Sequence, residues 1–313
     1  MTPAARQAAA LAILDHWLSG QPVEAALTQW ARASRYAGSG DREAVRDLVF
    51  RAVRQRRSAA ALGGAETGRA LLLGLARMDG APPQDWTGDG HAPAPLTPDE
   101  TARLGAPAPE LPRAVALDCP EWLLPAFDAA LGPATDAVLS LMRERAPVFV
   151  RVNRAAADVA GVIAELADQG IAARLHPLSA WALEITANAR RLRTTPAFAQ
   201  GRIEMQDAAS QAVAERFLDA APAGPVLDYC AGGGGKALAL AAAGRAVTAH
   251  DAAPRRMVDL PARAGRAGAR VRVLEGAASG RWPAILADAP CSGSGSWRRA
   301  PDAKWAFSAE RLQ

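Results

Sequence analysis

The sequence predicts a multidomain protein with a helical N-terminal part, a small α/β module and a C-terminal parallel sheet wound with helices. Apolar residues recur at helical spacing through residues 1–78, a strand-helix-strand order begins near residue 148, and strands and helices alternate regularly from Gly201. At 313 residues the chain is long enough for two or three domains. Hydrophobic residues make up 50% of it but aromatic residues only 5%, so we expect a helix-rich core of small side chains.

Residues 1–78 predict a helical bundle. Thr2 is a candidate N-cap, with Pro3 at the first helical position. Three apolar stripes at helical spacing follow: Leu11, Leu14 and Leu18; Val23, Leu27 and Trp30; and Val45, Leu48, Val49, Ala52 and Val53. The third stretch carries six arginines: Arg42, Arg46, Arg51, Arg54, Arg56 and Arg57. Such a density either grips phosphate groups or forms the solvated face of an ordinary helix, and the sequence leaves both open.

The middle of the chain divides into a linker, residues 79–119, and a module, residues 120–200. The linker is rich in Pro and Gly, a composition typical of loops. In the module we expect two short helices, a strand, a longer helix and two further strands; these are residues 120–131, 134–145, 148–153 and 156–169, and the stretch 171–185.

Residues 201–313 predict a parallel sheet. We expect helices over 207–220, 236–243 and 254–266, and strands over 225–228, 246–250, 270–274 and 284–288. The residues that follow the last strand supply no further strand to pair with it, so one edge of that strand would be unpaired. An intact parallel sheet buries or covers such an edge. We therefore expect an incomplete sheet.

Charge and cysteine content limit the class of protein. A formal charge of +4 tolerates a polyanionic partner without requiring one. Only Lys236 and Lys304 are lysines, so each is a candidate for chemistry that a planar guanidinium cannot perform. Three widely spaced cysteines favour neither a disulfide framework nor a metal site and fit a reducing cytoplasm. The sequence contains no uncharged apolar stretch long enough to predict a membrane span.

A glycine-rich turn joins the first strand of this sheet to its helix. Four consecutive glycines, Gly232 to Gly235, let the backbone approach a ligand, and the helix start supplies oriented amides. Asp251 ends the next strand, where a carboxylate can accept the two hydroxyl hydrogens of an adenosine ribose. These features predict nucleotide-type binding, either of a dinucleotide or of S-adenosyl-L-methionine.

A second candidate corner follows the last predicted strand. Asp288 and Cys291 stand at its carboxyl end, in the crevice where such sheets bind ligands. Small residues follow Cys291 and keep its sulfur accessible. Its thiol could act as a nucleophile or an acid/base, or could be a buried small apolar group.

Several segments together resemble one family. PVLDYCAGGGGK, AHDAAPRR, ADAPCSGSGSWRRAPDAKW, EMQDAASQ and FVRVN are similar to motifs of the RsmB/NOP/Sun family of RNA cytosine-5 methyltransferases. The resemblance implies a NusB-like RNA-binding helical domain over 1–78, a small RRM-like module within 120–200, and an incomplete Rossmann-like class I methyltransferase sheet over 201–313. It also implies a cytoplasmic monomer that acts on RNA, most simply ribosomal RNA, with no metal and no membrane.

The resemblance also implies roles for particular residues. The cofactor loop would be Cys230, Ala231, Gly232, Gly233, Gly234, Gly235 and Lys236, binding S-adenosyl-L-methionine together with Asp251 and Asp288. Lys236 would orient the site, and Asp288 would lie near the methionine end and the target base. In the family a cysteine thiolate adds to carbon 6 of a flipped-out cytosine, and carbon 5 then takes the methyl group.

Three departures qualify this carry-over. The attacking cysteine of the family lies in a later Thr-Cys-Ser motif, whereas the cysteine matching Cys291 assists product release, and no cysteine follows Cys291. We therefore expect a C-terminally truncated, catalytically deficient copy. Glycine replaces the usual proline of the loop, and Glu275 stands slightly early for an adenine contact.

Two other functions remain alternatives. A non-catalytic RNA-binding protein would keep the arginine-rich bundle and a vestigial methyltransferase fold, while a nicotinamide oxidoreductase has only the glycine loop in its favour. We expect His250 and Cys119 to be packed structural residues. Trp297, Arg298 and Arg299 either stack on and neutralise RNA or form an ordinary exposed loop.

Overall fold

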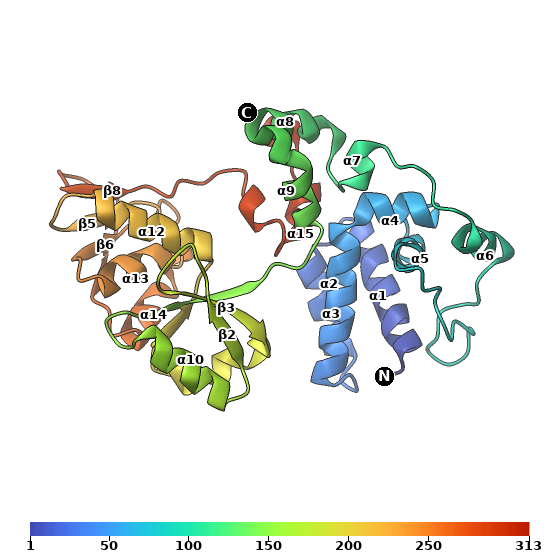
Figure 1. Ribbon diagram of the computed structural model, residues 1–313, viewed down its shortest axis with the longest axis horizontal. Coiled ribbons are helices and arrows are strands. Elements are labelled where there is room, and N and C mark those ends of the chain that lie inside the picture. The colour runs from blue at the N-terminus through green and yellow to red at the C-terminus, as the bar shows by residue number, and fades with distance from the viewer. Residues whose placement is uncertain (313) are drawn as a thin grey trace. The chain divides into compact units, whose positions relative to one another are not determined.

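The computed structural model describes residues 1–312. Its contacts divide the chain into two compact units: unit 1 comprises Met1–Ala146 with Ser292–Gln313, and unit 2 comprises Pro147–Cys291. Unit 1 is helical, and unit 2 holds two sheets (Figure 1). The predicted fold class, a helical part followed by an α/β module and a parallel sheet, is confirmed.

The N-terminal helices of unit 1 surround one apolar core. Thr2 caps the first helix as predicted, since its Oγ1 accepts from the amide of Ala5 at 3.2 Å. The core gathers the three predicted stripes, and Leu14, Val45 and Leu71 are fully buried in it. The helices are α1 (Pro3–Leu18), α2 (Val23–Ala33), α3 (Ser39–Arg54), α4 (Arg56–Gly63), α5 (Gly68–Met78), α6 (Pro98–Gly105), α7 (Arg113–Ala116), α8 (Leu124–Leu131), α9 (Thr135–Met142) and α15 (Pro301–Trp305), with single-turn elements η1 (Glu121–Leu123), η2 (Gly132–Ala134), η5 (Ser294–Ser296) and η6 (Ala309–Arg311).

The predicted linker is less irregular than its composition suggested. It contains α6 and α7, and α6 begins with a capping box in which Thr97 accepts from the amide of Glu100 while the Glu100 carboxylate accepts from the amide of Thr97. The sequence carries this signal as Thr-Pro-Asp-Glu. A short capped helix therefore forms within a stretch rich in Pro and Gly.

A second apolar cluster in unit 1 joins segments that are distant in sequence. Leu117, Cys119, Leu123 and Leu139 pack with Trp297, whose ring is only 2% exposed. Farther along the same C-terminal segment, α15 lies against α3 (Figure 1). The predicted boundaries assigned residues 120–146 to the module and 292–313 to the parallel-sheet domain, whereas the contacts group both with the N-terminal helices. The buried Trp297 ring cannot stack on RNA, which corrects that part of the sequence interpretation.

The first sheet of unit 2 has the strand order β2-β3-β1-β4, with every pairing antiparallel. Its apolar side chains, Val150, Leu183 and Ile203 among them, are buried against α10. The strands and helices are β1 (Val148–Val152), α10 (Val159–Asp168), β2 (Ala172–Leu175), β3 (Ala182–Ala187), η3 (Ala189–Thr194), α11 (Pro196–Ala199) and β4 (Ile203–Met205). Strand β4 is absent from the sequence prediction, which began the next domain at Gly201.

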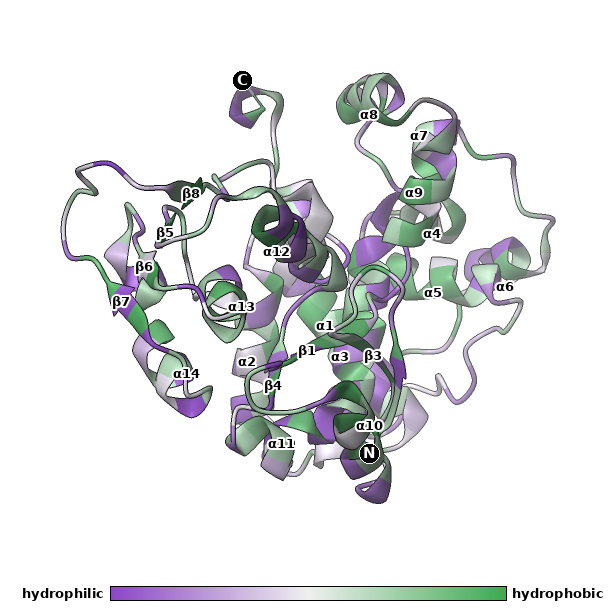
Figure 2. Ribbon diagram, turned by 60° about the vertical axis from the view of Figure 1, so that its left-hand side comes forward, coloured by the Kyte–Doolittle hydropathy of each residue, from purple (hydrophilic) through white to green (hydrophobic). Residues whose placement is uncertain are grey.

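The second sheet of unit 2 is parallel, in the order β7-β6-β5-β8. Helices α13 and α14 pack on its apolar side chains, with Val226, Val247 and Leu260 in that core. The elements are α12 (Ala208–Ala220), β5 (Val226–Asp228), α13 (Gly235–Ala242), β6 (Val247–Ala249), η4 (Pro254–Met257), α14 (Leu260–Arg266), β7 (Val271–Val273) and β8 (Ala284–Leu286). Among the described residues β8 pairs only with β5, and its apolar residues are coloured green in Figure 2.

Candidate functional site

The glycine loop connects β5 to α13 and has a backbone that side chains would not permit. Gly232 has φ +52° and Gly234 has φ +81°, both in the left-handed region. A Cβ atom at Gly234 would lie 2.1 Å from Cδ1 of Leu260. Gly234 is the N-cap of α13, so the loop ends where the helix begins.

The loop leaves several amides open to a ligand. Gly232 donates to Asp251 Oδ2 at 3.0 Å and Gly234 donates to the carbonyl of Ala231 at 2.8 Å. Within residues 1–312, the amides of Gly233, Gly235 and Lys236 have no hydrogen-bond acceptor. Three donors at a helix start suit the oxygen atoms of a bound ligand.

Asp251 directly follows β6 and is held from two sides. Its Oδ1 accepts from the amide of Ala253 at 2.9 Å, and its Oδ2 lies 3.0 Å from Nη1 of Arg256. Burial raises the pKa of Asp251, but the amides of Ala253 and Gly232 and the charge of Arg256 together outweigh this and leave the pKa below its usual range. The carboxylate is therefore ionised at neutral pH and ready to accept hydroxyl hydrogens.

Lys236 and Asp288 meet at the carboxyl ends of neighbouring strands. The Nζ of Lys236 donates to Asp288 Oδ2 at 2.6 Å. Because β5 and β8 are parallel neighbours, the loop after one and the corner after the other lie at the same edge of the sheet. Cys291 follows Asp288 by three residues and is exposed. The pairing of β5 with β8 thus brings the glycine loop and the Asp288 corner into contact.

Asp228 is a polar residue of this region that the sequence analysis missed. It ends β5, is 1% exposed, and neither carboxylate oxygen meets a donor in good hydrogen-bond geometry within the described part of the chain. Burial raises the pKa of Asp228 to about 6, against a smaller lowering by the charge of Lys236. The sequence could have indicated Asp228, because it is an acidic residue at the end of an apolar strand, directly before the glycine loop.

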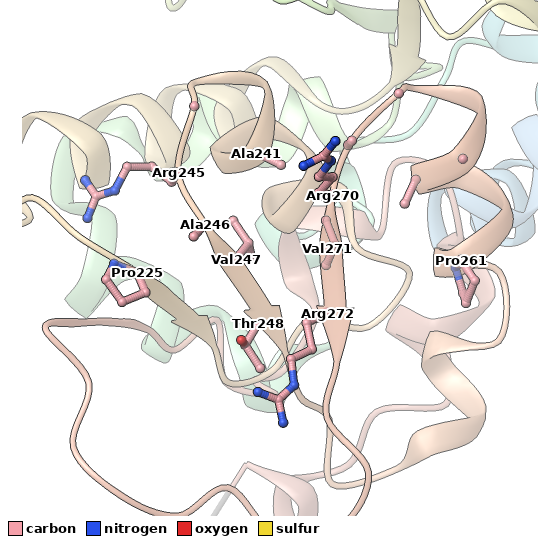
Figure 3. Close-up of a pocket in the computed structure, with 15 residues that line it drawn as sticks. Pro225, Ala241, Arg245, Ala246, Val247, Thr248, Pro261, Arg270, Val271 and Arg272 are labelled. Carbon is pink, nitrogen blue, oxygen red and sulfur yellow. The ribbon is translucent and has the colours of Figure 1, made fainter.

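A groove of about 990 Å³ lies at the opposite end of the parallel strands (Figure 3). It is lined by residues that precede or begin strands, including Pro225, Ala246 and Arg270. The side chains of Arg270 and Arg272 point to opposite sides in Figure 3, so they do not converge on one ligand. Neither the glycine loop nor Asp288 lines this groove.

The arginines of α3 and α4 have partners inside unit 1. Most of these pairs are partly exposed, as on the solvated face that was one of the two sequence alternatives. Arg46, Arg51, Arg56 and Arg57 pair with Glu24, Asp79, Glu66 and Glu121, and Arg42 and Arg54 donate to the carbonyls of Ala37 and Arg298.

The remaining candidates have packing contacts. His250 is 6% exposed and stacks on Tyr229 with ring centroids 4.7 Å apart. Cys119 is fully buried, and burial raises the pKa of its thiol to about 11. Across residues 1–312 no three His, Cys, Asp or Glu side chains gather as a metal site would require. No helix in the same range combines the length and apolarity needed to cross a bilayer.

Two family models match this chain in adjacent segments. Residues 119–190 match the RsmF/B-like methyltransferase ferredoxin-like domain, and residues 215–312 match 16S rRNA methyltransferase RsmB/F. The crystal structure of PH0851 has a TM-score of 0.70 at 20% identity, covering 100% of this chain and 80% of that one, which supports the fold.

Curated relatives agree with these models. Ribosomal RNA small subunit methyltransferase B of Xanthomonas campestris pv. campestris is 35% identical over 195 residues, which are 58% of this chain and 44% of that protein. The protein of the same name from Cronobacter sakazakii is 33% identical over 198 residues, covering 59% and 45%. The matched part thus spans less than half the length of either relative. Because both family models and these relatives carry the same family name, residues 119–190 and 215–312 of this chain belong to the RsmB/F family.

Proposed function

We propose that this chain binds S-adenosyl-L-methionine and takes part in methylating carbon 5 of a cytosine in ribosomal RNA. The observation that carries the proposal is the contact between Lys236 and Asp288, 2.6 Å apart. It joins the loop suited to a cofactor with the corner that bears Cys291. A cofactor and a target base bound there would lie within reach of one another.

The chemistry of the loop fits the cofactor. The open amides of Gly233, Gly235 and Lys236 suit its carboxylate, and Asp251 suits the hydroxyls of its ribose. The buried carboxylate of Asp228, which has no donor in good geometry, suits its ammonium group. When bound, S-adenosyl-L-methionine would supply a methyl group on a positively charged sulfur.

The residues at the corner would handle the target base. A cytosine must leave its stack before a protein group can reach carbon 5 or 6. Asp288, whose side chain is 57% exposed, and Lys236 would bind the polar edge of the extruded base. Following the family resemblance, Cys291 would assist release of the methylated product. Residues 292–313 contain no cysteine that could serve as the attacking thiol of the family reaction.

Ribosomal RNA is proposed as the substrate from the names of the relatives and from the family. The arginines of α3 and α4 are not assigned to phosphate contacts, because ion pairs and carbonyl contacts within unit 1 already engage them. This weakens the alternative of a non-catalytic RNA-binding protein, which relied on that helical stretch.

Binding of S-adenosylhomocysteine to the full chain, measured by calorimetry, tests the cofactor assignment. Asp251→Ala should weaken binding about tenfold, because a pair of hydroxyl donors would lose its acceptor at roughly 1–3 kcal/mol. Asp219→Ala, on the exposed end of α12, is the matched control and should change nothing. A wild-type chain that does not bind the ligand would contradict the proposal and favour the non-catalytic alternative.

The chemical position is tested separately with tritium-labelled methyl donor and 16S rRNA under single-turnover conditions, using a chain to which the family's strand with the Thr-Cys-Ser motif is joined after residue 313. Labelled 5-methylcytidine after digestion would support carbon 5 of cytosine. Label on any other nucleoside would contradict it.

A further inference from the structure

We propose that Glu204 and Arg263 are positioning residues that hold the glycine loop in the shape that binds the cofactor. Through them the antiparallel sheet of unit 2 fixes a loop of the parallel sheet. This inference rests on the proposed function of the loop as a cofactor site. It gives the antiparallel sheet of unit 2 a mechanical role in cofactor binding.

Arg263 connects the two sheets with one guanidinium group. It lies on α14, and its Nη1 donates to the carbonyl of Gly233. Its Nη2 lies 3.3 Å from Oε1 of Glu204, which is in the middle of β4. A planar guanidinium can hold a carbonyl and a carboxylate at once with fixed geometry.

The absence of a side chain at position 233 leaves room for the guanidinium of Arg263 beside the loop. A Cβ atom there would lie 2.8 Å from Nη1 of Arg263. The guanidinium therefore lies directly against the loop backbone. Any side chain at Gly233 would push Arg263 away from the carbonyl.

Glu204 is itself held firmly. Its Oε2 lies 2.7 Å from Nη2 of Arg266, and its side chain is only 7% exposed. In the sheet Glu204 is paired with Arg151 on β1, a buried arginine that donates to Gln206 Oε1 at 2.7 Å. Burial lowers the pKa of Arg151 to about 10, against the opposing effect of Glu204. One buried carboxylate thus faces three guanidinium groups, and Arg263 alone of the three is bonded to the loop.

The loop needs such a support because four consecutive glycines have little conformational preference. A peptide unit is planar, so fixing the carbonyl of Gly233 also fixes the amide of Gly234. That amide donates to the carbonyl of Ala231 and closes the turn. Held in this way, the loop offers its open amides without first having to be ordered by the ligand, which favours binding.

Arg263→Ala and Arg266→Ala form a matched pair for the test. Each removes one arginine of α14 and one ion pair with Glu204, but only Arg263 contacts the loop. We measure S-adenosylhomocysteine affinity by calorimetry and, without ligand, hydrogen exchange of peptides covering residues 229–238. Arg263→Ala should weaken affinity at least tenfold and speed exchange in the loop, whereas Arg266→Ala should change affinity less than threefold and leave loop exchange as in wild type.

The exchange measurement separates this inference from the proposed function. If the wild-type chain does not bind S-adenosylhomocysteine, the proposed function fails, while loop exchange in Arg263→Ala still decides the positioning role. Equal effects of the two variants, or unchanged loop exchange in Arg263→Ala, would overturn the inference. Arg263→Lys keeps the charge and one donor and should give intermediate exchange, so it replaces Arg263→Ala if that variant does not fold.

Discussion

The two lysines of this chain occupy opposite kinds of polar site. Lys236 follows the glycine loop in unit 2, and its partner Asp288 is more than half exposed. Lys304 lies in unit 1, is 3% exposed, and donates to the carbonyl of Asp118 at 2.6 Å. Both stand in segments that resemble family motifs, so motif membership does not separate their roles.

Their surroundings do separate them. Burial lowers the pKa of Lys304 to about 8, and its ammonium group lies over the ring of Trp305, 4.3 Å from the ring centroid. Beside it, the buried carboxylate of Asp118 accepts from Ser58 and Arg143. Lys304 thus links the C-terminal segment to Asp118 within unit 1. Lys236 is less buried, with its side chain 13% exposed, and its ammonium group pairs with the exposed carboxylate of Asp288. The comparison teaches that a compact ammonium group can be retained for packing as well as for chemistry.

The largest effect on stability is expected from Lys304→Met. It leaves the Asp118 carbonyl and nearby buried charges without their donor, which should cost about 2–4 kcal/mol in the unfolding of unit 1. Urea unfolding followed by tryptophan fluorescence measures this, since six of the eight tryptophans lie in unit 1. A decrease in unfolding free energy of less than about 0.5 kcal/mol would contradict this structural role of Lys304, because the loss of a buried hydrogen-bond partner costs more.

The next effect concerns Asp228, the buried carboxyl group that ends β5. The pKa of Asp228 is raised to about 6 in the folded chain, so the folded state binds this proton more tightly than the unfolded state. The stability this proton contributes is present below about pH 4 and lost as the pH rises through 6. Asp228→Asn should therefore raise stability by up to about 2–3 kcal/mol at pH 8 and by only about 0.5 kcal/mol at pH 4. Thermal unfolding at both pH values checks this, and equal shifts would contradict it.

Lys236→Met tests the role proposed for the other lysine. Its ion pair with a half-exposed carboxylate should contribute less than about 1 kcal/mol to stability. Affinity for S-adenosylhomocysteine should nevertheless fall about tenfold, because a charge at the cofactor loop is lost. Lys304→Met is the control and should leave that affinity unchanged. If the two variants exchanged these outcomes, the assignment of roles would be reversed.

The smallest effect is expected from Arg46→Ala on α3. Its exposed pair with Glu24 and its contact with the Phe50 ring at 4.8 Å should together contribute no more than about 1 kcal/mol. RNA affinity in a filter-binding assay should stay within twofold of wild type. A large loss of RNA binding would restore the phosphate-gripping role considered for this helix.

Local sequence patterns predicted most of the regular structure. The helical stripes of unit 1 and the alternation around β5 and α13 are periodic over enough residues to identify their elements. Strand β4 was missed, and its place beside β1 depends on pairing across about fifty residues of sequence. Only packing reveals that the ring of Trp297 lies with Leu139 of unit 1, because the two residues are far apart in sequence.

By itself the sequence determined which residues could carry the chemistry: the glycine run, Asp251, Asp288, Cys291 and the two lysines. Glycine permits a left-handed turn, and carboxylates bring their acceptor atoms wherever the chain places them. The tertiary structure decided which of these groups meet. It paired Lys236 with Asp288, buried Lys304 and Asp228, and brought Glu204 to the glycine loop through Arg263. Such contacts depend on strand order and helix packing, and no local stretch of sequence encodes the distance between residues far apart in the chain.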